Sequence, residues 1–143
     1  MRNFLILFAS AASLLLGACG SDVEESAAPP QRSDVEESAG TPISAGKLAD
    51  RIQAGSPPLI LDVRTREEYT QGHIPGAINI PHDELPTRLA ELPIAKSEEV
   101  VVHCGSGGRT QPAEKTLRAS GYSNVRILTG HWGQWQAKRL PTE

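Results

Sequence analysis

Short apolar runs separated by longer mixed segments are the clearest pattern along the chain. Leu59–Val63 and Val100–His103 are unbroken runs rich in branched side chains, and they predict strands that are buried on both faces. Asn124–Leu128 predicts a further strand. Ala77–Ile80, framed by prolines and a glycine, predicts a weaker one. The pattern therefore predicts four short strands between residues 59 and 128.

Segments with helical spacing alternate with these strands. Ser44 can cap a helix that runs to about Ala54. Further helices are predicted over residues 83–92, 110–120 and 130–138. Strands alternating with helices predict an α/β fold, in which a mostly parallel sheet has helices on both faces. Ligands bind such sheets beyond the carboxyl ends of the strands, so we expect a functional site in the residues that follow the strand ending at position 103.

Residues 1–18 have the pattern of an export signal. After a positive start, residues 4–16 are thirteen apolar or small residues, too few to cross about 30 Å of hydrocarbon comfortably as a helix. Leu16–Cys19 resembles the lipobox of bacterial lipoproteins, in which the cysteine is lipidated and the chain is cut before it. The alternatives are an ordinary signal peptide with an incidental cysteine, or a buried helix. The resemblance implies that Cys19 anchors the protein on the periplasmic side of the cell envelope, and Gly20 after it favours the outer membrane in a Gram-negative cell.

Residues 19–40 have the composition of a tether. Ser21–Ala27 is repeated unchanged as Ser33–Ala39, and residues 19–40 carry six acids and one base. Too few apolar groups are present to offset the entropy of ordering such a segment. We therefore expect a disordered acidic tether over residues 19–40 and one folded domain over residues 41–143.

Composition excludes several classes of protein. Hydrophobic residues make up 38% of the 143 positions and charged residues 22%, which is typical of a globular domain. Lysine and arginine number 14 against 17 acidic residues, so there is no cationic surplus for nucleic acid. Two cysteines are too few for a disulfide-stapled mini-protein or a four-cysteine zinc site. The histidines lack helical ligand spacing, so we expect neither metal nor cofactor, and a monomer is the default expectation.

Cys104 ends the predicted strand and begins a glycine-rich loop. The loop and the start of the next helix consist of Gly105, Ser106, Gly107, Gly108, Arg109 and Thr110. Glycines allow successive N–H groups to point inward as an anion-binding nest, and the helix N-terminus adds positive potential. Arg109 can add a full charge with forked donors. Because such surroundings lower the pKa of a cysteine, the pattern predicts a thiolate nucleophile that faces a bowl preferring anions.

Two structural alternatives apply to Cys104. It can be a buried structural cysteine followed by a flexible turn, or it can form a disulfide with Cys19. If Cys19 carries lipid, Cys104 is an unpaired thiol in an exported protein, and such thiols are usually reactive.

Four segments carry a family resemblance: Leu61–Tyr69, Gly72–Pro81, Val102–Thr110 and Leu128–Trp135. They resemble motifs of the rhodanese (thiosulfate sulfurtransferase) family over most of residues 43–140, and the best match is to its small, exported, single-domain members. His131 departs from the resemblance, because a second glycine is common at its position. The resemblance implies the rhodanese-like three-layer fold with a central sheet of about five strands.

The resemblance also implies a reaction. Cys104 attacks the outer sulfur of thiosulfate or a similar small anionic donor, sulfite leaves, and a persulfide remains for transfer to cyanide, a thiol or another acceptor. The amides of residues 105–110 and the charge of Arg109 stabilise the anionic persulfide. Asp62 and Arg64, at the end of the first strand, brace the loop. The alternative for this last pair is a surface ion pair at a strand end.

Two other functions remain open. Cysteine-dependent phosphatases, and arsenate reductases like them, share the order His-Cys-loop-Arg, but they place five residues between cysteine and arginine where this chain has four. A persulfide carrier or binding module that does not turn over is the second alternative.

The other notable side chains have structural interpretations. We expect His73 to fix a turn and His103 to end a strand. Trp132 and Trp135, three residues apart on a predicted helix, favour core packing. Glu67–Glu68 is interpreted as a solvated face.

Overall fold

The computed structural model describes residues 40–143. The predicted signal segment over residues 1–18, the lipidation site Cys19 and residues 19–39 of the acidic tether lie outside the described residues. Among the residues that are described, no helix is both long and apolar enough to span a membrane.

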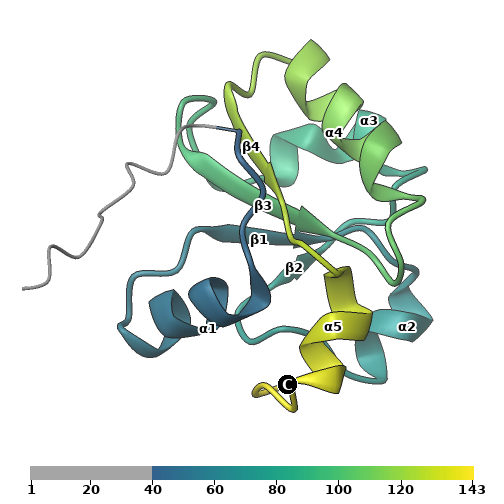
Figure 1. Ribbon diagram of the computed structural model, residues 1–143. Coiled ribbons are helices and arrows are strands. Elements are labelled where there is room, and N and C mark those ends of the chain that lie inside the picture. Colours follow the sequence, from purple (N-terminus) through teal and green to yellow (C-terminus); the bar gives the residue numbers. More distant parts are fainter. Residues whose placement is uncertain (1–39) are drawn as a thin grey trace, which may run out of the picture. The chain divides into compact units, whose positions relative to one another are not determined.

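Four parallel strands form a single sheet in the order β2-β1-β3-β4 (Figure 1). Each begins and ends within one residue of the strand predicted from the apolar runs, because those runs supply the buried side chains of the sheet. The α/β fold class is therefore confirmed. The strands are β1 (Leu59–Asp62), β2 (Ile78–Asn79), β3 (Glu99–His103) and β4 (Asn124–Ile127).

The sheet has four strands in the described part of the chain, whereas the family resemblance implied about five. Ile43 lies where another strand would begin, and it forms only an isolated parallel bridge with Leu128. Ile43 N–H donates to the carbonyl of Ile127 at 2.9 Å, and Thr129 N–H donates to the carbonyl of Ile43 at 2.8 Å. Pairing stops after this residue because Ser44 already caps the first helix.

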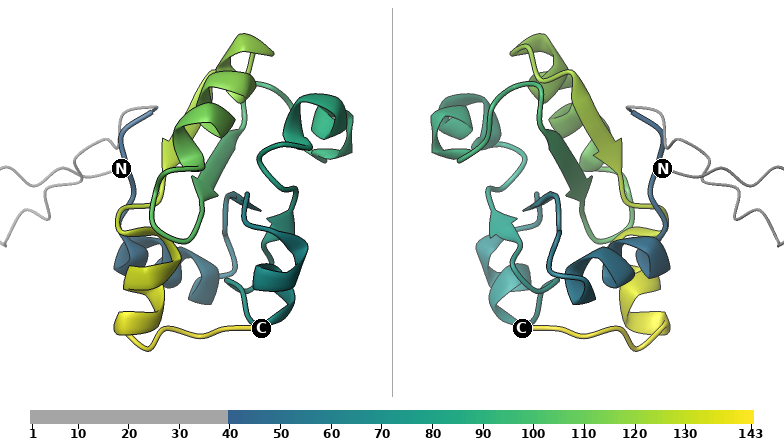
Figure 2. Two further views of the ribbon diagram at one scale, coloured as in Figure 1. Left: turned by 90° about the vertical axis from the view of Figure 1, so that its right-hand side faces the viewer. Right: turned by 90° about the vertical axis from the view of Figure 1, so that its left-hand side faces the viewer.

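Helices cover both faces of the sheet, which confirms the three-layer arrangement. Figure 1 shows α3 and α4 on one side and α1 and α5 on the other, and the side views in Figure 2 show the same separation. The helices are α1 (Ala45–Gln53), α2 (Arg66–Thr70), α3 (Leu85–Arg88), α4 (Thr110–Ala119) and α5 (His131–Ala137).

Alternating strand residues divide the core in two. Val100 and Val102 of β3 pack in one buried cluster with Leu117 of α4. Val101, which points the other way, packs in a second cluster with Leu48 of α1 and Trp135 of α5. Because successive side chains of a strand point to opposite faces, this arrangement holds β3 in the centre of the molecule and fixes where its carboxyl end emerges.

Two predicted helical segments differ in detail from the structure. The helix expected over residues 83–92 is shorter, and it continues as the 3₁₀ turn Leu89–Glu91. Helix α2 was not predicted. It begins with a capping box, in which the hydroxyl of Thr65 accepts from Glu68 N–H at 3.3 Å and the Glu68 carboxylate accepts from Thr65 N–H at 3.1 Å.

The last residues of the chain return to the segment after α2. His73 N–H donates to the carbonyl of Glu143 at 2.8 Å, and Glu143 N–H donates back to the carbonyl of His73 at 3.0 Å. Figure 2 shows the C-terminus beside α2. This pairing ties the turn around His73 to the end of the chain.

Candidate active site

Cys104 lies where the carboxyl end of β3 meets the glycine-rich loop. Its residue is only 1% exposed, and its Sγ accepts a hydrogen bond from Gly107 N–H at 2.9 Å. The hydroxyl of Thr110, the first residue of α4, lies 3.4 Å from Sγ. Thr110 also donates to the carbonyl of Gly107 through its N–H and through its hydroxyl, at 3.1 and 2.8 Å. These bonds fold the loop back over the sulfur.

Backbone conformation and space both require glycine at position 107. Its φ is +114°, which lies in the left-handed region that side chains rarely adopt. A Cβ there would also come within 2.8 Å of His131 Nε2. His131 itself has a φ of +51°, which explains why a glycine suits its position in the resemblance. The histidine ring therefore packs directly against the loop segment that donates to the sulfur.

Two opposing effects act on the Cys104 thiol. Burial raises its pKa, because removing the thiolate from water is unfavourable. The hydroxyl of Thr110 and the N–H groups of Gly107, Arg109 and Ser106 stabilise the thiolate, and together they hold the pKa below its ordinary value. The loop thus has the inward-facing donors of an anion nest. In the structure Cys104 is a free thiol, not part of a disulfide.

Arg109 is placed differently from what the sequence suggested. Its guanidinium binds the Glu68 carboxylate through two hydrogen bonds of 2.5 and 2.9 Å, so its forked donors are already engaged. The bond to Arg109 is the main reason why the pKa of Glu68 falls to about 2, and the carboxylate stays ionised at neutral pH. The interpretation of Glu67–Glu68 as a solvated face did not include this ion pair, although the Glu68 side chain remains 37% exposed. The charge of Arg109 is balanced, and the loop amides supply the uncompensated donors around Sγ.

Asp62 and Arg64 form a buried ion pair rather than a surface one. Their side chains are 0% and 3% exposed, and Arg64 Nε and Nη2 donate to the two carboxylate oxygens at 3.0 and 2.6 Å. The backbone N–H of Arg64 also donates to Asp62. Arg64 Nη2 reaches the carbonyl of Gly72 at 2.9 Å, and its guanidinium lies 4.5 Å from the ring centre of Trp132.

This pair reaches the candidate nucleophile through intermediate residues. Asp62 is the register partner of His103, the residue before Cys104, and the two side chains approach to 3.7 Å. Trp132, which stacks on Arg64, donates its backbone N–H to the carbonyl of Cys104 at 3.0 Å. The pair therefore contacts His103 and Trp132, which adjoin Cys104, and forms no hydrogen bond with residues 105–110, although the charge of Asp62 helps to raise the pKa of Arg109.

His103 is the last residue of β3, as expected, and it is fully buried. Neither ring nitrogen has a hydrogen-bond partner among the described residues. Burial is the main reason why its pKa falls to about 4, although Asp62 acts in the opposite direction. The ring is neutral at neutral pH, so the Asp62 carboxylate has Arg64 as its charged partner.

The remaining interpretations of single residues mostly hold. His73 Nδ1 lies 3.1 Å from the carbonyl of Tyr69, which is consistent with a turn-fixing role. Trp135 is buried in the core and donates Nε1–H to the carbonyl of Pro141 at 2.8 Å. Trp132 is only partly buried; it packs against the edge of the same core cluster as Trp135, and its ring also stacks on the Arg64 guanidinium.

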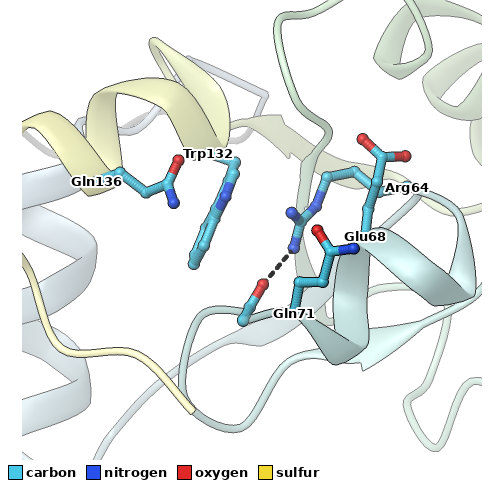
Figure 3. Close-up of a pocket in the computed structure, with 6 residues that line it drawn as sticks. Arg64, Glu68, Gln71, Trp132 and Gln136 are labelled. Carbon is cyan, nitrogen blue, oxygen red and sulfur yellow. Dashed lines mark hydrogen bonds between the residues drawn. The ribbon is translucent and has the colours of Figure 1, made fainter.

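One cavity is lined by Glu68 and Trp132, which bind Arg109 and the carbonyl of Cys104, and another is lined by the loop itself. The first, of about 300 Å³ and shown in Figure 3, lies between α2 and α5. The second, of about 530 Å³, lies on the side of His131 and the first turn of α4. No cluster of histidine, cysteine and carboxylate side chains within residues 40–143 is arranged to hold a metal ion. The lining of the first cavity is Arg64, Glu68, Gln71, Gly72, Trp132 and Gln136; that of the second includes Ser106, Gly107, Gly108, Thr110, Gln111 and His131.

The described residues form an α/β domain with the Cys104 thiol in a nest of loop amides, and known proteins are similar to it in sequence and in fold. Residues 44–138 match the family model of the rhodanese-like domain. A sulfurtransferase of Allochromatium vinosum is 35% identical over 99 residues, which cover 69% of this chain and 91% of the relative. The thiosulfate:glutathione sulfurtransferase of Homo sapiens is 35% identical over 113 residues, which cover 70% and 97%.

A solved structure agrees. The rhodanese-related protein from Thermoplasma volcanium superimposes with a TM-score of 0.62 at 28% identity, covering 72% of this chain and 97% of that one. The chain belongs to the rhodanese-like domain family. Its relatives include sulfurtransferases, which supports sulfur transfer as its general activity.

Proposed function

We propose that this protein is a thiosulfate sulfurtransferase. It moves a sulfane sulfur from thiosulfate, or a similar small anion, to cyanide or a thiol through a persulfide on Cys104. The observation that carries the proposal is the donor set around Sγ, where loop N–H groups and the Thr110 hydroxyl favour the thiolate despite its burial. The name of the human relative, which joins thiosulfate and glutathione, supports the same pair of substrates.

The first step follows from the thiolate. Cys104 Sγ attacks the outer sulfur of thiosulfate, the sulfur–sulfur bond of the donor breaks, and its electron pair leaves with sulfite. A persulfide anion remains on the enzyme, with the same total charge on both sides of the reaction. The inward N–H groups of Ser106, Gly107 and Arg109 then stabilise the anionic sulfur, because preorganised dipoles in a site shielded from water cost no reorganisation.

The geometry disfavours a phosphatase. Such an enzyme needs a forked arginine free to bind phosphate oxygens, whereas the donors of Arg109 are engaged by Glu68. The loop also has four residues between Cys104 and Arg109, which makes a tighter bowl than the five of the phosphatases.

The test is a single-turnover reaction with thiosulfate and no acceptor. We expect about one sulfite per protein and one added sulfur atom on Cys104 by mass spectrometry of the intact chain. Cys104→Ser should release no sulfite and gain no sulfur, while Cys19→Ser serves as the matched cysteine control and should behave like the wild type. Equal sulfite release by Cys104→Ser contradicts the proposal, as does turnover of an aryl phosphate with none of thiosulfate.

Addition of cyanide or a thiol then separates an enzyme from a carrier. The enzyme proposal requires loss of the bound sulfur and repeated sulfite release. A persulfide that forms and never transfers would instead identify a binding module.

We also propose that lipid on Cys19 holds the domain at the periplasmic side of the cell envelope. Cys19→Ser should move the protein from the membrane fraction to the soluble fraction, and an unchanged distribution contradicts the anchor.

A further inference from the structure

His131 is the first residue of α5, the helix that follows β4 (Figure 1), and its ring packs against the loop that holds the candidate nucleophile. A Cβ on Gly107 would stand 2.8 Å from His131 Nε2, and Gly107 N–H donates to Cys104 Sγ at 2.9 Å. A single residue therefore separates the imidazole from the sulfur. A group bound at Nε2 lies beside the amide that stabilises the thiolate.

The position of His131 is costly for a histidine. Its φ of +51° lies in the left-handed region, which is uncommon for residues other than glycine. Its Nδ1 is buried and has no hydrogen-bond partner in the described part of the chain. A glycine would avoid both costs. Strained residues of this kind cluster at functional sites, and here the imidazole is what a glycine would lack.

The two ring nitrogens of His131 have different surroundings. Nδ1 is buried, whereas Nε2 is not, and within residues 40–143 neither has a partner. Burial lowers the pKa of His131, so the ring is neutral at neutral pH and carries one proton. A proton on Nδ1 would be a buried donor without an acceptor, so the favoured tautomer has the proton on Nε2. Nε2–H is therefore a donor available to a ligand.

The larger cavity brings this donor and the loop together. His131 lines it, and so do Ser106, Gly107, Gly108 and Thr110 of the loop. Its volume of about 530 Å³ is ample for a small molecule. No lysine or arginine among the described residues lines this cavity, so an anion that enters it depends on neutral donors.

The charged groups near this cavity are already paired. The acid in its lining, Glu114, accepts from Arg118 Nε at 2.9 Å, so it does not present an unbalanced negative charge to an anion. The guanidinium of Arg109 is bound to Glu68 and is likewise engaged. The imidazole N–H is then the side-chain donor that packs directly against the amide nest.

We propose that His131 Nε2–H binds the anionic oxygens of the sulfur donor and thereby selects anionic donors. The inference rests on the proposed sulfurtransferase activity and adds a specificity-determining residue to it. Thiosulfate carries its oxygens and its outer sulfur on one central atom, so an oxygen held at Nε2 keeps the outer sulfur beside the loop. An N–H donor favours such a ligand because hydrogen bonds to ionised acceptors are the stronger ones.

The histidine donates a hydrogen bond and transfers no proton. Cys104 Sγ attacks the outer sulfur, the sulfur–sulfur bond of the donor breaks, and its electron pair leaves with sulfite. Thiosulfate arrives with two negative charges and sulfite leaves with two, while the single charge of the thiolate passes to the persulfide. His131 therefore holds the same group, an oxyanion, before and after the step.

Three variants of the full chain separate the N–H donor from the ring. His131→Phe keeps an aromatic ring against Gly107 and removes the donor. His131→Gln places an amide N–H at about the reach of Nε2. His131→Asn has an amide too short for that reach, and because asparagine tolerates positive φ it provides the test if His131→Phe does not fold. The matched control is Gln111→Ala, which removes an exposed side-chain amide from the same cavity.

The first readout is alkylation of Cys104 by two reagents of equal size, measured on the Cys104 peptide by mass spectrometry. Iodoacetate, like thiosulfate, carries anionic oxygens on the atom next to the one that reacts, whereas iodoacetamide is neutral. We expect the ratio of the iodoacetate rate to the iodoacetamide rate to fall about tenfold in His131→Phe and His131→Asn, the effect of losing one hydrogen bond to a charged group. The iodoacetamide rate itself should change less than twofold.

The second readout is sulfite release in a single turnover with thiosulfate. In His131→Phe the thiosulfate concentration at half saturation should rise about tenfold, while the rate at saturation should change less than threefold. His131→Gln and Gln111→Ala should stay within about threefold of the wild type in both readouts.

Three results would overturn the proposal. One is an unchanged ratio of alkylation rates in His131→Phe and His131→Asn. Another is an equal slowing of both reagents, because the ring would then only hold the loop in place. The third is an equal fall of the ratio in Gln111→Ala.

Failure of the proposed function is separable from failure of this inference. Alkylation requires no sulfur transfer, so a fallen ratio without any sulfite release would contradict the thiosulfate reaction and support the anion site at His131. Normal sulfite release by His131→Phe with an unchanged half-saturation would contradict the role of His131 and leave the proposed function standing.

Discussion

Thr110→Val tests whether the surroundings of Cys104 keep its sulfur ionised. Valine keeps the branched shape of a side chain that is only 2% exposed, and it removes the hydroxyl that lies 3.4 Å from Sγ. The hydroxyl is the first of the groups that lower the thiol pKa, so the pKa should rise in the variant. Gly107 N–H, at 2.9 Å, remains as a donor.

The size of the effect follows from the two contacts of the hydroxyl. Hydrogen bonds to charged groups contribute about 1.5–3 kcal/mol. In this site the contact with Sγ is long, and the single hydroxyl proton is shared with the carbonyl of Gly107 at 2.8 Å, so the sulfur receives only part of that energy. We take about 1 kcal/mol, which is about a fivefold change in the thiolate population at a pH below the thiol pKa.

Alkylation by iodoacetamide measures this population, because only the thiolate reacts. The rate for Thr110→Val at acidic to neutral pH should be about fivefold lower than for the wild type, and the two should converge at high pH, where both thiols are ionised. Thr110→Ser keeps the hydroxyl and should follow the wild type. If Thr110→Val has the same pH dependence of alkylation as the wild type, the hydroxyl does not stabilise the thiolate and the reasoning fails. The same conclusion follows if Thr110→Ser shifts that pH dependence as far as Thr110→Val does.

Two further predictions concern stability. Asp62→Asn leaves the charge of Arg64 buried without its partner and should lower the free energy of unfolding in urea by about 3–5 kcal/mol. The control Glu114→Gln breaks an exposed ion pair and should lower it by less than about 1 kcal/mol. Equal losses of stability in the two variants would contradict the importance of burial. His103 has a pKa of about 4 when folded against 6.5 as its ordinary value, so the unfolded chain binds more protons between these pH values. Stability should therefore fall as pH drops from about 6.5 to 4, by at most about 3 kcal/mol, and His103→Leu should remove most of that slope; an unchanged slope in the leucine variant would assign it to other groups.

Local patterns were enough to predict most of the fold. The apolar run that ends at His103 predicted the central strand, because a strand buried on both faces needs consecutive apolar side chains. The glycines after Cys104 predicted the loop, because positive φ values favour glycine. Ser44 likewise marked the start of α1 through its capping side chain. The missing fifth strand could not be inferred in this way, since the extent of pairing at Ile43 depends on where the chain turns in space.

The partners within the site could not be predicted because they lie far apart in the sequence. Glu68 and Arg109 form an ion pair although they are 41 positions apart, and no sequence pattern near either residue predicts the contact. The only signal at Glu68 was its place three residues after Thr65, which indicates a capping box and says nothing of an arginine. The stacking of Trp132 on Arg64 is of the same kind, since its helical spacing indicated core packing, which the structure has, and did not indicate an arginine partner.

The two-way backbone pairing of Glu143 with His73 has a practical consequence for handling the protein. The neighbouring Gly72 supplies the carbonyl that Arg64 binds, so a purification tag fused directly after Glu143 would begin beside the wall of the cavity between α2 and α5. An affinity handle placed ahead of residue 40, followed by a cleavable spacer, leaves that corner of the molecule untouched and makes kinetic comparisons between variants cleaner.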